Sequence, residues 1–105
     1  MRPVIVGEPL AGYPGLHMVD RAAGPRAMLA GRRLRVSDIV RAVEDNDGSE
    51  ARAAEWFEIE LQAVQTAMRY YRDHRDLVDG WIRAEDEYAD RAEREWLREH
   101  GHKFA

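Results

Sequence analysis

Apolar residues recur at the helical period over much of the second half of the chain, and this feature constrains the fold most. Four of them fall at positions i, i+3, i+7 and i+10, on one face of a helix: Leu61, Val64, Met68 and Tyr71. A longer apolar stripe runs through residues 76–99. These two helices span more than a third of 105 residues, so the sequence predicts a mainly α fold with one modest core.

The first third of the chain favours extended structure. Six of the first fifteen residues are Pro or Gly, so residues 1–25 are predicted to form an irregular or extended N-terminal arm. Two short runs, residues 26–29 and 32–36, flank the turn at Ala30-Gly31. They predict a short β-hairpin with its arginines on one exposed face and its apolar residues turned inward.

Three helices follow, and each has a predicted start. Ser37 is expected to cap the first helix and Ser49 the second, which runs to Phe57. A tight turn at Glu58-Ile59 then leads into the helix that starts near Glu60. The second and third helices have helix-turn-helix proportions. We therefore divide the chain into the arm, a hairpin and helix-turn-helix core over residues 26–75, and a C-terminal helix with its tail over residues 76–105.

The charge is unevenly distributed. The chain carries a net −4, but residues 26–41 carry five arginines against one acid. Residues 42–75 and 76–99 are both acidic. This pattern predicts a polyanionic partner for one end of the molecule and a basic protein surface for the other. The alternative is that the arginines pair with acids of the same chain, each pair contributing little at a surface.

Several classes of protein are excluded by what the sequence lacks. Without cysteine, the chain has no disulfide framework, thiol catalysis or Cys-ligated zinc. No long apolar run and no secretory signal are present, so we expect no membrane contact and a cytoplasmic location. No Gly-rich phosphate loop or nucleophile elbow occurs. We therefore expect no enzyme activity, no cofactor and no metal site.

Two segments carry a family resemblance. Residues 26–40 read Arg-Ala-Met-Leu-Ala-Gly-Arg-Arg-Leu-Arg-Val-Ser-Asp-Ile-Val, and residues 56–74 read Trp-Phe-Glu-Ile-Glu-Leu-Gln-Ala-Val-Gln-Thr-Ala-Met-Arg-Tyr-Tyr-Arg-Asp-His. In this order and separation they resemble a bacterial family first described as domain-of-unknown-function 433. The matching positions are Arg26, Gly31, Arg33, Val36, Ser37, Asp38, Ile39, Val64, Ala67, Tyr70, Tyr71, Asp73 and His74.

The resemblance implies a VapB-like type II antitoxin. Such proteins form dimers with a winged or homeodomain-like helix-turn-helix, bind and inhibit a PIN-like ribonuclease toxin, and repress their own operon. Two departures concern the helix-turn-helix. Trp56-Phe57 stands where the family has Tyr-Pro, and Glu60 stands where it has a threonine cap. These changes affect how the third helix would dock on DNA more than they affect the fold.

If the chain binds operator DNA, two sets of residues are predicted to contact it. The phosphate contacts would come from Arg32, Arg33, Arg35 and Arg41. The base contacts would come from the third helix, through Gln62, Gln65 and Thr66. Because Glu58 and Glu60 flank the start of that helix and repel phosphates, docking through the hairpin is the alternative.

The acidic C-terminal helix is predicted to bind the toxin. A PIN-like active site is a cluster of acids around a divalent cation, and an inserted guanidinium would pair with those carboxylates. The predicted arginines are Arg91, Arg94 and Arg98, and the predicted aromatic and apolar contacts are Trp81, Tyr88, Trp96 and Leu97. The alternative is that the tryptophans are ordinary core or dimer contacts.

The sequence therefore predicts a cytoplasmic antitoxin with no catalytic residue. Its expected partners are the cognate PIN-like ribonuclease toxin and operator DNA, with the chain forming a homodimer or a hetero-oligomer with the toxin. Two alternatives stay open: a stand-alone helix-turn-helix regulator without a toxin, and an adaptor module that binds only protein.

Overall fold

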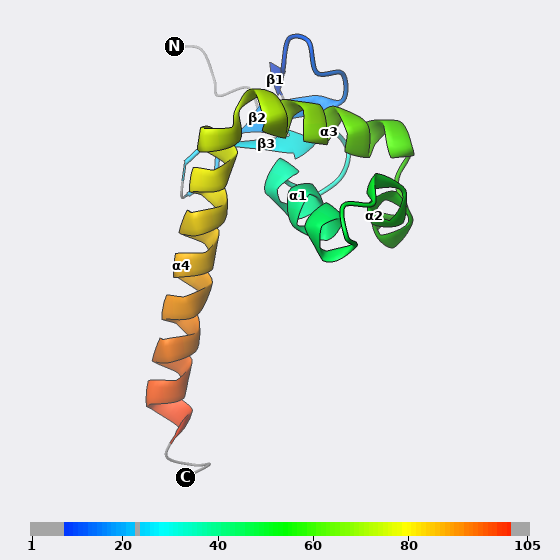
Figure 1. Cartoon of the computed structure of the whole chain (residues 1–105). Helices are drawn as coiled ribbons and strands as arrows, with labels where there is room; N and C mark the ends of the chain where they lie inside the picture. Colours follow the sequence, from blue (N-terminus) through cyan, green and yellow to red (C-terminus); the bar gives the residue numbers. More distant parts are fainter. Residues whose placement is uncertain (1–7, 23, 102–105) are drawn as a thin grey trace, which may run out of the picture.

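The chain folds into a small antiparallel sheet followed by four helices, as a computed structural model shows for residues 8–22 and 24–101. The strands lie in the order β1–β2–β3. Their bounds are β1 Glu8–Pro9, β2 Leu16–Val19 and β3 Arg26–Leu29. The helices are α1 Val36–Asp45, α2 Glu50–Phe57, α3 Leu61–Asp73 and α4 Arg75–His100 (Figure 1). The predicted mainly α fold with an N-terminal hairpin and a long C-terminal helix is confirmed. Residues 1–7 of the predicted arm lie outside the described residues.

The hairpin is built from different strands than predicted. β3 pairs antiparallel along its length with β2, with Leu16 opposite Leu29, and not with residues 32–36 as a second strand. Those residues make only an isolated bridge between Met28 and Arg35 before α1 begins. The reason is the core: Leu16 is fully buried and gives β3 an apolar partner, whereas the run 32–36 opens with two exposed arginines.

The helix starts follow the predictions in part. Ser49 caps α2 as predicted, because its Oγ accepts a hydrogen bond from the amide of Arg52 at 3.1 Å. The prediction that Ser37 caps α1 is wrong, since the helix begins at Val36 and its N-cap position is Arg35. The cap is supplied instead by Asp38, whose Oδ2 accepts from the Arg35 amide at 3.0 Å. Ser37 is thereby free to turn its side chain into the protein.

The core lies where α1, α3, the inner face of the sheet and the first turns of α4 meet. Its fully buried large side chains are Leu16, Val36, Ile39, Val40, Val64 and Val78. On α3 the buried face is Val64, Ala67, Tyr70 and Tyr71, while Leu61, predicted on that face, is 43% exposed. Leu61 is the first residue of the helix, where no neighbouring element covers it.

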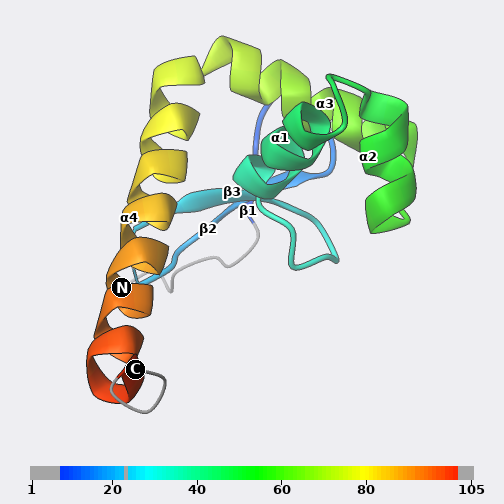
Figure 2. The same cartoon turned by 60° about the horizontal axis from the view of Figure 1, so that its bottom comes forward.

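α3 and α4 meet at His74, which ends one helix and begins the other. The two helices turn sharply there (Figure 2). Tyr13, Tyr70, His74 and Trp81 form an aromatic cluster at this corner, with Tyr70 stacked on His74 at 4.3 Å between ring centroids. This cluster positions α4 relative to the rest of the fold.

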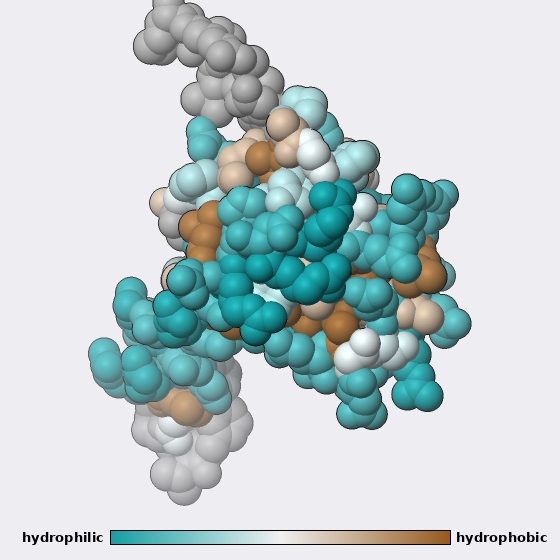
Figure 3. Space-filling view, turned by 45° about the horizontal axis from the view of Figure 1, so that its top comes forward, coloured by the Kyte–Doolittle hydropathy of each residue, from teal (hydrophilic) through white to brown (hydrophobic). Residues whose placement is uncertain are grey.

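The second half of α4 projects from the described body of the protein (Figure 1). Val78 and Trp81 are buried, but every residue from 86 to 99 is exposed. The radius of gyration is 16.2 Å, against about 13 Å for a compact chain of this length. Figure 3 shows one mostly hydrophilic face with only small hydrophobic areas. Among the described residues, no helix combines the length and apolar character needed to span a bilayer.

Candidate functional site

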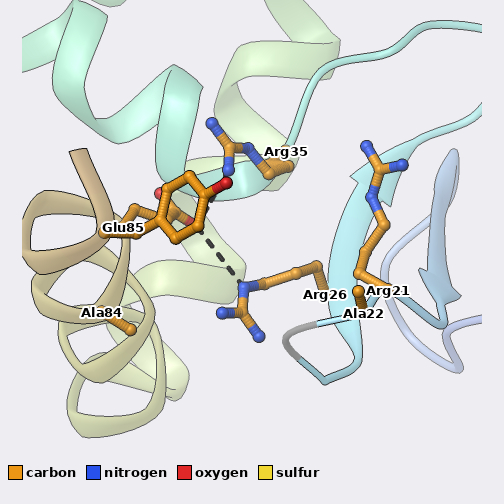
Figure 4. A pocket seen from close by; sticks show the side chains of 7 residues that line it. Arg21, Ala22, Arg26, Arg35, Ala84 and Glu85 are labelled. Carbon is orange, nitrogen blue, oxygen red and sulfur yellow. Dashed lines mark hydrogen bonds and ion pairs between the residues drawn. The ribbon is translucent and has the colours of Figure 1, made fainter. Parts of the chain in front are cut away.

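Glu85 fastens α4 to the sheet and to α1. Its Oε2 atom lies 3.4 Å from Arg26 Nε, 3.3 Å from Arg35 Nη1 and 3.1 Å from the Ser37 hydroxyl, which donates to it. Figure 4 shows Arg26 and Arg35 reaching toward this carboxylate from β3 and from the residue before α1. Because the side chains of Arg26 and Glu85 are only 7% and 14% exposed, this contact belongs to the interior.

Two of the four arginines that were predicted to contact phosphates form ion pairs within the chain. Arg35 forms a two-pronged pair with Asp38, with Nη2–Oδ1 at 2.9 Å and Nε–Oδ2 at 3.1 Å. This hydrogen bonding raises the pKa of Arg35 above its ordinary value. Arg41 pairs with Asp86 and donates to the carbonyl of Ile82. Carboxylates of α1 and α4 thus already pair with Arg35 and Arg41, and the role of these two arginines as DNA contacts stays a prediction.

The other two, Arg32 and Arg33, are exposed and come together with residues of β2. They line a groove of about 660 Å³ together with residues of β2 and β3. We call it the sheet groove; its residues are His17, Val19, Arg21, Met28, Leu29, Ala30, Gly31, Arg32 and Arg33. Arg21 was not among the predicted site residues. It follows β2, which ends at Val19, and the alternation of residues 17 and 19 along the strand was the available signal for this face of the strand.

The start of α3 offers less for reading bases than predicted. Gln62 and Gln65 are exposed. Thr66 is only 8% exposed and its Oγ1 donates to the carbonyl of Gln62 at 2.9 Å, so its prediction as a base contact is wrong. Threonine makes this bond within a helix because the i−4 carbonyl lies within reach of its hydroxyl.

On α4, Trp81 differs from the other predicted toxin contacts. It is 8% exposed, and Arg26 stacks over its ring at 5.4 Å. Trp81 is thus a core residue, as the alternative reading held, and the prediction that it contacts a toxin is wrong. Tyr88, Trp96 and Leu97 are 73%, 50% and 48% exposed, and Trp96 also stacks on His100 at 4.5 Å between ring centroids.

The exposed residues of α4 form two separate stripes. Tyr88, Ala92 and Trp96 follow Trp81 and Glu85 at steps of three and four residues, so they continue the face by which α4 packs on the core. Arg91, Arg94 and Arg98, at i, i+3 and i+7, form a second stripe on another side of the helix. All three arginines are exposed, and no ion pair links them to the described part of the chain.

A cavity joins the first stripe to the sheet. It has a volume of about 460 Å³ and lies between α4 and the end of β2, with Tyr88 in its wall. The other lining residues are Arg21, Ala22, Arg26, Arg35, Ala84 and Glu85. A side chain of a partner lying along Tyr88 and Ala92 would reach this cavity, so α4 and the sheet can form one concave protein-binding surface.

The described residues hold no group of three or more metal-ligating side chains. Comparisons with protein-family models, curated proteins and solved structures found no match. The likeness to an antitoxin family therefore still depends on the two sequence motifs alone.

Proposed function

We propose that this chain is the antitoxin of a type II toxin–antitoxin pair and that the exposed half of α4 binds a PIN-like ribonuclease. The observation that carries the proposal is the exposed stripe of Tyr88, Ala92 and Trp96. It prolongs a core-packing face beyond the body of the protein. The two sequence motifs support the same function independently.

The energetics favour a protein partner for this stripe. Aromatic side chains are the residues that most often dominate interface energies. Burying the exposed parts of Tyr88 and Trp96 contributes on the order of 1.5 to 3 kcal/mol each. Ala92 lies between them, and its small side chain lets a second backbone approach the helix closely.

The arginine stripe supplies the inhibitory chemistry in this proposal. A guanidinium presents planar paired donors that match a carboxylate. Arg91, Arg94 and Arg98 form no ion pair within the described chain. When α4 lies in the toxin's cleft, one of them enters the acid cluster that holds the divalent cation. The same carboxylates then cannot hold the metal, and cleavage of RNA stops.

The test is co-expression of the full chain with the product of the adjacent gene, followed by size-exclusion chromatography and a ribonuclease assay. We expect a stable complex whose nuclease activity returns when this chain is removed. The double variant Tyr88→Ala/Trp96→Ala should weaken the complex at least tenfold, a loss of about 1.4 kcal/mol. Trp56→Ala is the matched control, because Trp56 is 76% exposed on α2 and away from α4.

Two results would contradict the proposal. Absence of any complex would favour the stand-alone regulator, provided that the chain binds DNA, and otherwise the adaptor. A complex that loses as much affinity with Trp56→Ala as with the α4 variant would place the interface elsewhere on the protein.

A further inference from the structure

The cavity between α4 and the end of β2 carries more positive than negative charge. Its lining includes three arginines, Arg21, Arg26 and Arg35, and one acid, Glu85. We propose that this cavity binds an organic carboxylate, with Arg26 as the fixed donor and Arg21 as the exposed one. The carboxylate belongs either to an acidic side chain of the protein that lies along α4 or to a free small acid, and the chemistry of recognition is the same. Only the first of these sources rests on the function proposed above.

Arg26 is held in place with one donor group left over. Its side chain is only 7% exposed, its Nε pairs with Glu85, and its Nη1 donates to the carbonyl of Pro25 at 3.0 Å. Its guanidinium also lies over the ring of Trp81. No residue in the described part of the chain accepts a hydrogen bond from Nη2. A buried and already oriented cation thus lines the cavity with two unused N–H donors, so little side-chain entropy is lost when an anion binds.

Arg21 supplies the positive charge that is left over at this cavity. Arg35 pairs with Asp38 and Glu85. Arg26 pairs with the same Glu85. Arg21 is exposed and forms no ion pair with any described residue. Three guanidinium groups therefore face two carboxylates, and an anion that enters the cavity balances the remaining positive charge.

Glu85, the one acid among the lining residues, offers a ligand no free oxygen. Its Oε2 is contacted by Arg26, by Arg35 and by the Ser37 hydroxyl. Its Oε1 is buried. An anion in the cavity thus meets guanidinium donors, while both oxygens of this carboxylate are covered or already engaged.

The rest of the wall is small and apolar, and it sets the size of the ligand. Figure 4 shows Arg21 and Arg26 on the strand side of the cavity and Ala84 on the α4 side. Ala22 and the Tyr88 ring complete the lining. The volume of about 460 Å³ lies within the range of small-molecule sites, on the order of 300 to 1,000 Å³.

A carboxylate on a compact apolar or aromatic group matches both parts of this wall. Its oxygens form charge-assisted hydrogen bonds with the guanidinium groups. Its apolar part covers the two alanines and the tyrosine ring. Inorganic phosphate would match the arginines alone, so the wall favours an organic acid.

The experiment is a titration of the full chain with benzoate at constant ionic strength, followed by proton–nitrogen NMR. Benzamide, a neutral molecule of the same shape, is the control ligand. We expect benzoate to cause saturable shifts of the amide signals of Ala22, Ala84 and Glu85 and of the Nε–H signal of Arg26. Benzamide should bind about tenfold more weakly, because it cannot form the charge-assisted bonds.

Two variants at exposed positions test the two parts of the wall. Arg21→Gln should weaken benzoate binding about threefold to fivefold. Its control is Arg33→Gln, which removes the same charge from an exposed site outside the cavity and should bind like the wild type. Ala84→Leu fills the cavity and should abolish binding, whereas Ala89→Leu, exposed on the same helix outside the cavity, should not.

Three results would overturn the proposal: no saturable shift with benzoate, equal binding of benzoate and benzamide, or wild-type binding by both Arg21→Gln and Ala84→Leu. Loss of binding in Arg33→Gln equal to that in Arg21→Gln would also contradict it, because the effect would then reflect net charge alone.

Complex formation with the adjacent gene product distinguishes the two sources of the carboxylate. If the partner supplies it, Arg21→Gln and Ala84→Leu weaken the complex and excess benzoate competes with the partner. If a free acid is the ligand, both variants keep the affinity of the complex. Benzoate binding without any complex would support this pocket and contradict only the function proposed above. A stable complex formed by a chain that does not bind benzoate would do the reverse.

Discussion

At the scale of single residues, one carboxylate controls how the C-terminal helix is held. The Oε2 atom of Glu85 is contacted by side chains of β3, of α1 and of the residue before α1, while its Oε1 is buried with no hydrogen-bond partner among the described residues. A buried ion pair contributes little net stability, because burying its charges costs free energy. Removing the carboxylate is strongly destabilising, because the arginines that paired with it stay buried and charged. Among residues outside the apolar core, Glu85 is therefore the one whose substitution should lower the free energy of unfolding most.

We predict that Glu85→Ala lowers the free energy of unfolding by roughly 3 kcal/mol, because Arg26 is left as an uncompensated buried cation. Urea unfolding measures the change. Glu87→Ala, on the exposed side of the same helix, is the control and should change stability by less than about 0.5 kcal/mol. Equal effects of the two variants would show that the ion cluster does not hold α4.

The pKa values of three tyrosines predict how the stability of the protein changes at alkaline pH. The hydroxyl of Tyr13 donates to Asp73 Oδ2 at 2.6 Å, and this bond raises the pKa of Tyr13 above 10.0. Burial raises the pKa of Tyr70, and burial followed by a hydrogen bond to Asp79 raises the pKa of Tyr71.

The pKa values of these tyrosines are higher in the folded protein than in the unfolded chain. Their contribution to the free energy of unfolding is therefore fully present below the unfolded-state pKa of about 10 and is lost as the pH rises through the folded-state pKa values. Ultraviolet titration of tyrosinate together with urea unfolding at several pH values tests this. Tyr13→Phe should make the loss of stability with pH less steep. Titration of all three tyrosines at the ordinary value would contradict the prediction.

At the scale of elements, two glycines with different backbone geometry should respond oppositely to alanine. Gly80 lies within α4, and an added Cβ would meet only Arg83 Nη2 at 3.8 Å, which is an ordinary contact. Gly80→Ala should therefore stabilise the protein by about 0.5 to 1 kcal/mol. Gly31→Ala should destabilise it although the space there is open, because Gly31 has a positive φ. Thermal unfolding measures both, and a change of the same sign would refute the argument.

The first half of α4 is packed against the core and the second half is exposed. This division predicts where the chain can be truncated without loss of the fold. Val78 and Trp81 belong to the core, and Glu85 and Asp86 bind arginines of the body. We predict that residues 1–87 fold with cooperative unfolding, whereas residues 1–75 do not, as circular dichroism would show. The boundary predicted at residue 76 thus falls inside the packed structure. A folded fragment 1–75 would show that the core does not need the first turns of α4.

At the scale of the whole molecule, α4 projects from a small folded body. We expect the local stability against unfolding to decrease along the exposed half of this helix. We predict that amides of residues 88–100 exchange hydrogen faster than those of residues 77–86, because only the latter are covered by packed side chains. Binding of the toxin should slow exchange in 88–100 and leave α1 unchanged. Uniform protection along α4 in the free protein would indicate that the exposed half is already covered, for instance by a second copy.

The local part of this structure could be predicted from sequence, and the long-range part could not. The helical period of residues 61–73 and the Ser49 cap depend on neighbours within about four positions, so the sequence alone could predict them. The sequence alone thereby determined a mainly α fold with a long, charged C-terminal helix. The likeness to antitoxins stays a prediction of the motifs.

The tertiary structure decided which arginines remain available. Arg26 and Glu85 are 59 positions apart, and Arg41 and Asp86 are 45 apart, so no local pattern could indicate that these charges cancel. The same holds for β3, which pairs with the strand before it because Leu16 completes the core, and this pairing brings Arg21 beside Arg32 and Arg33. Electrostatic function at a surface depends on the charge left after such distant pairs form, and only the folded arrangement reveals it.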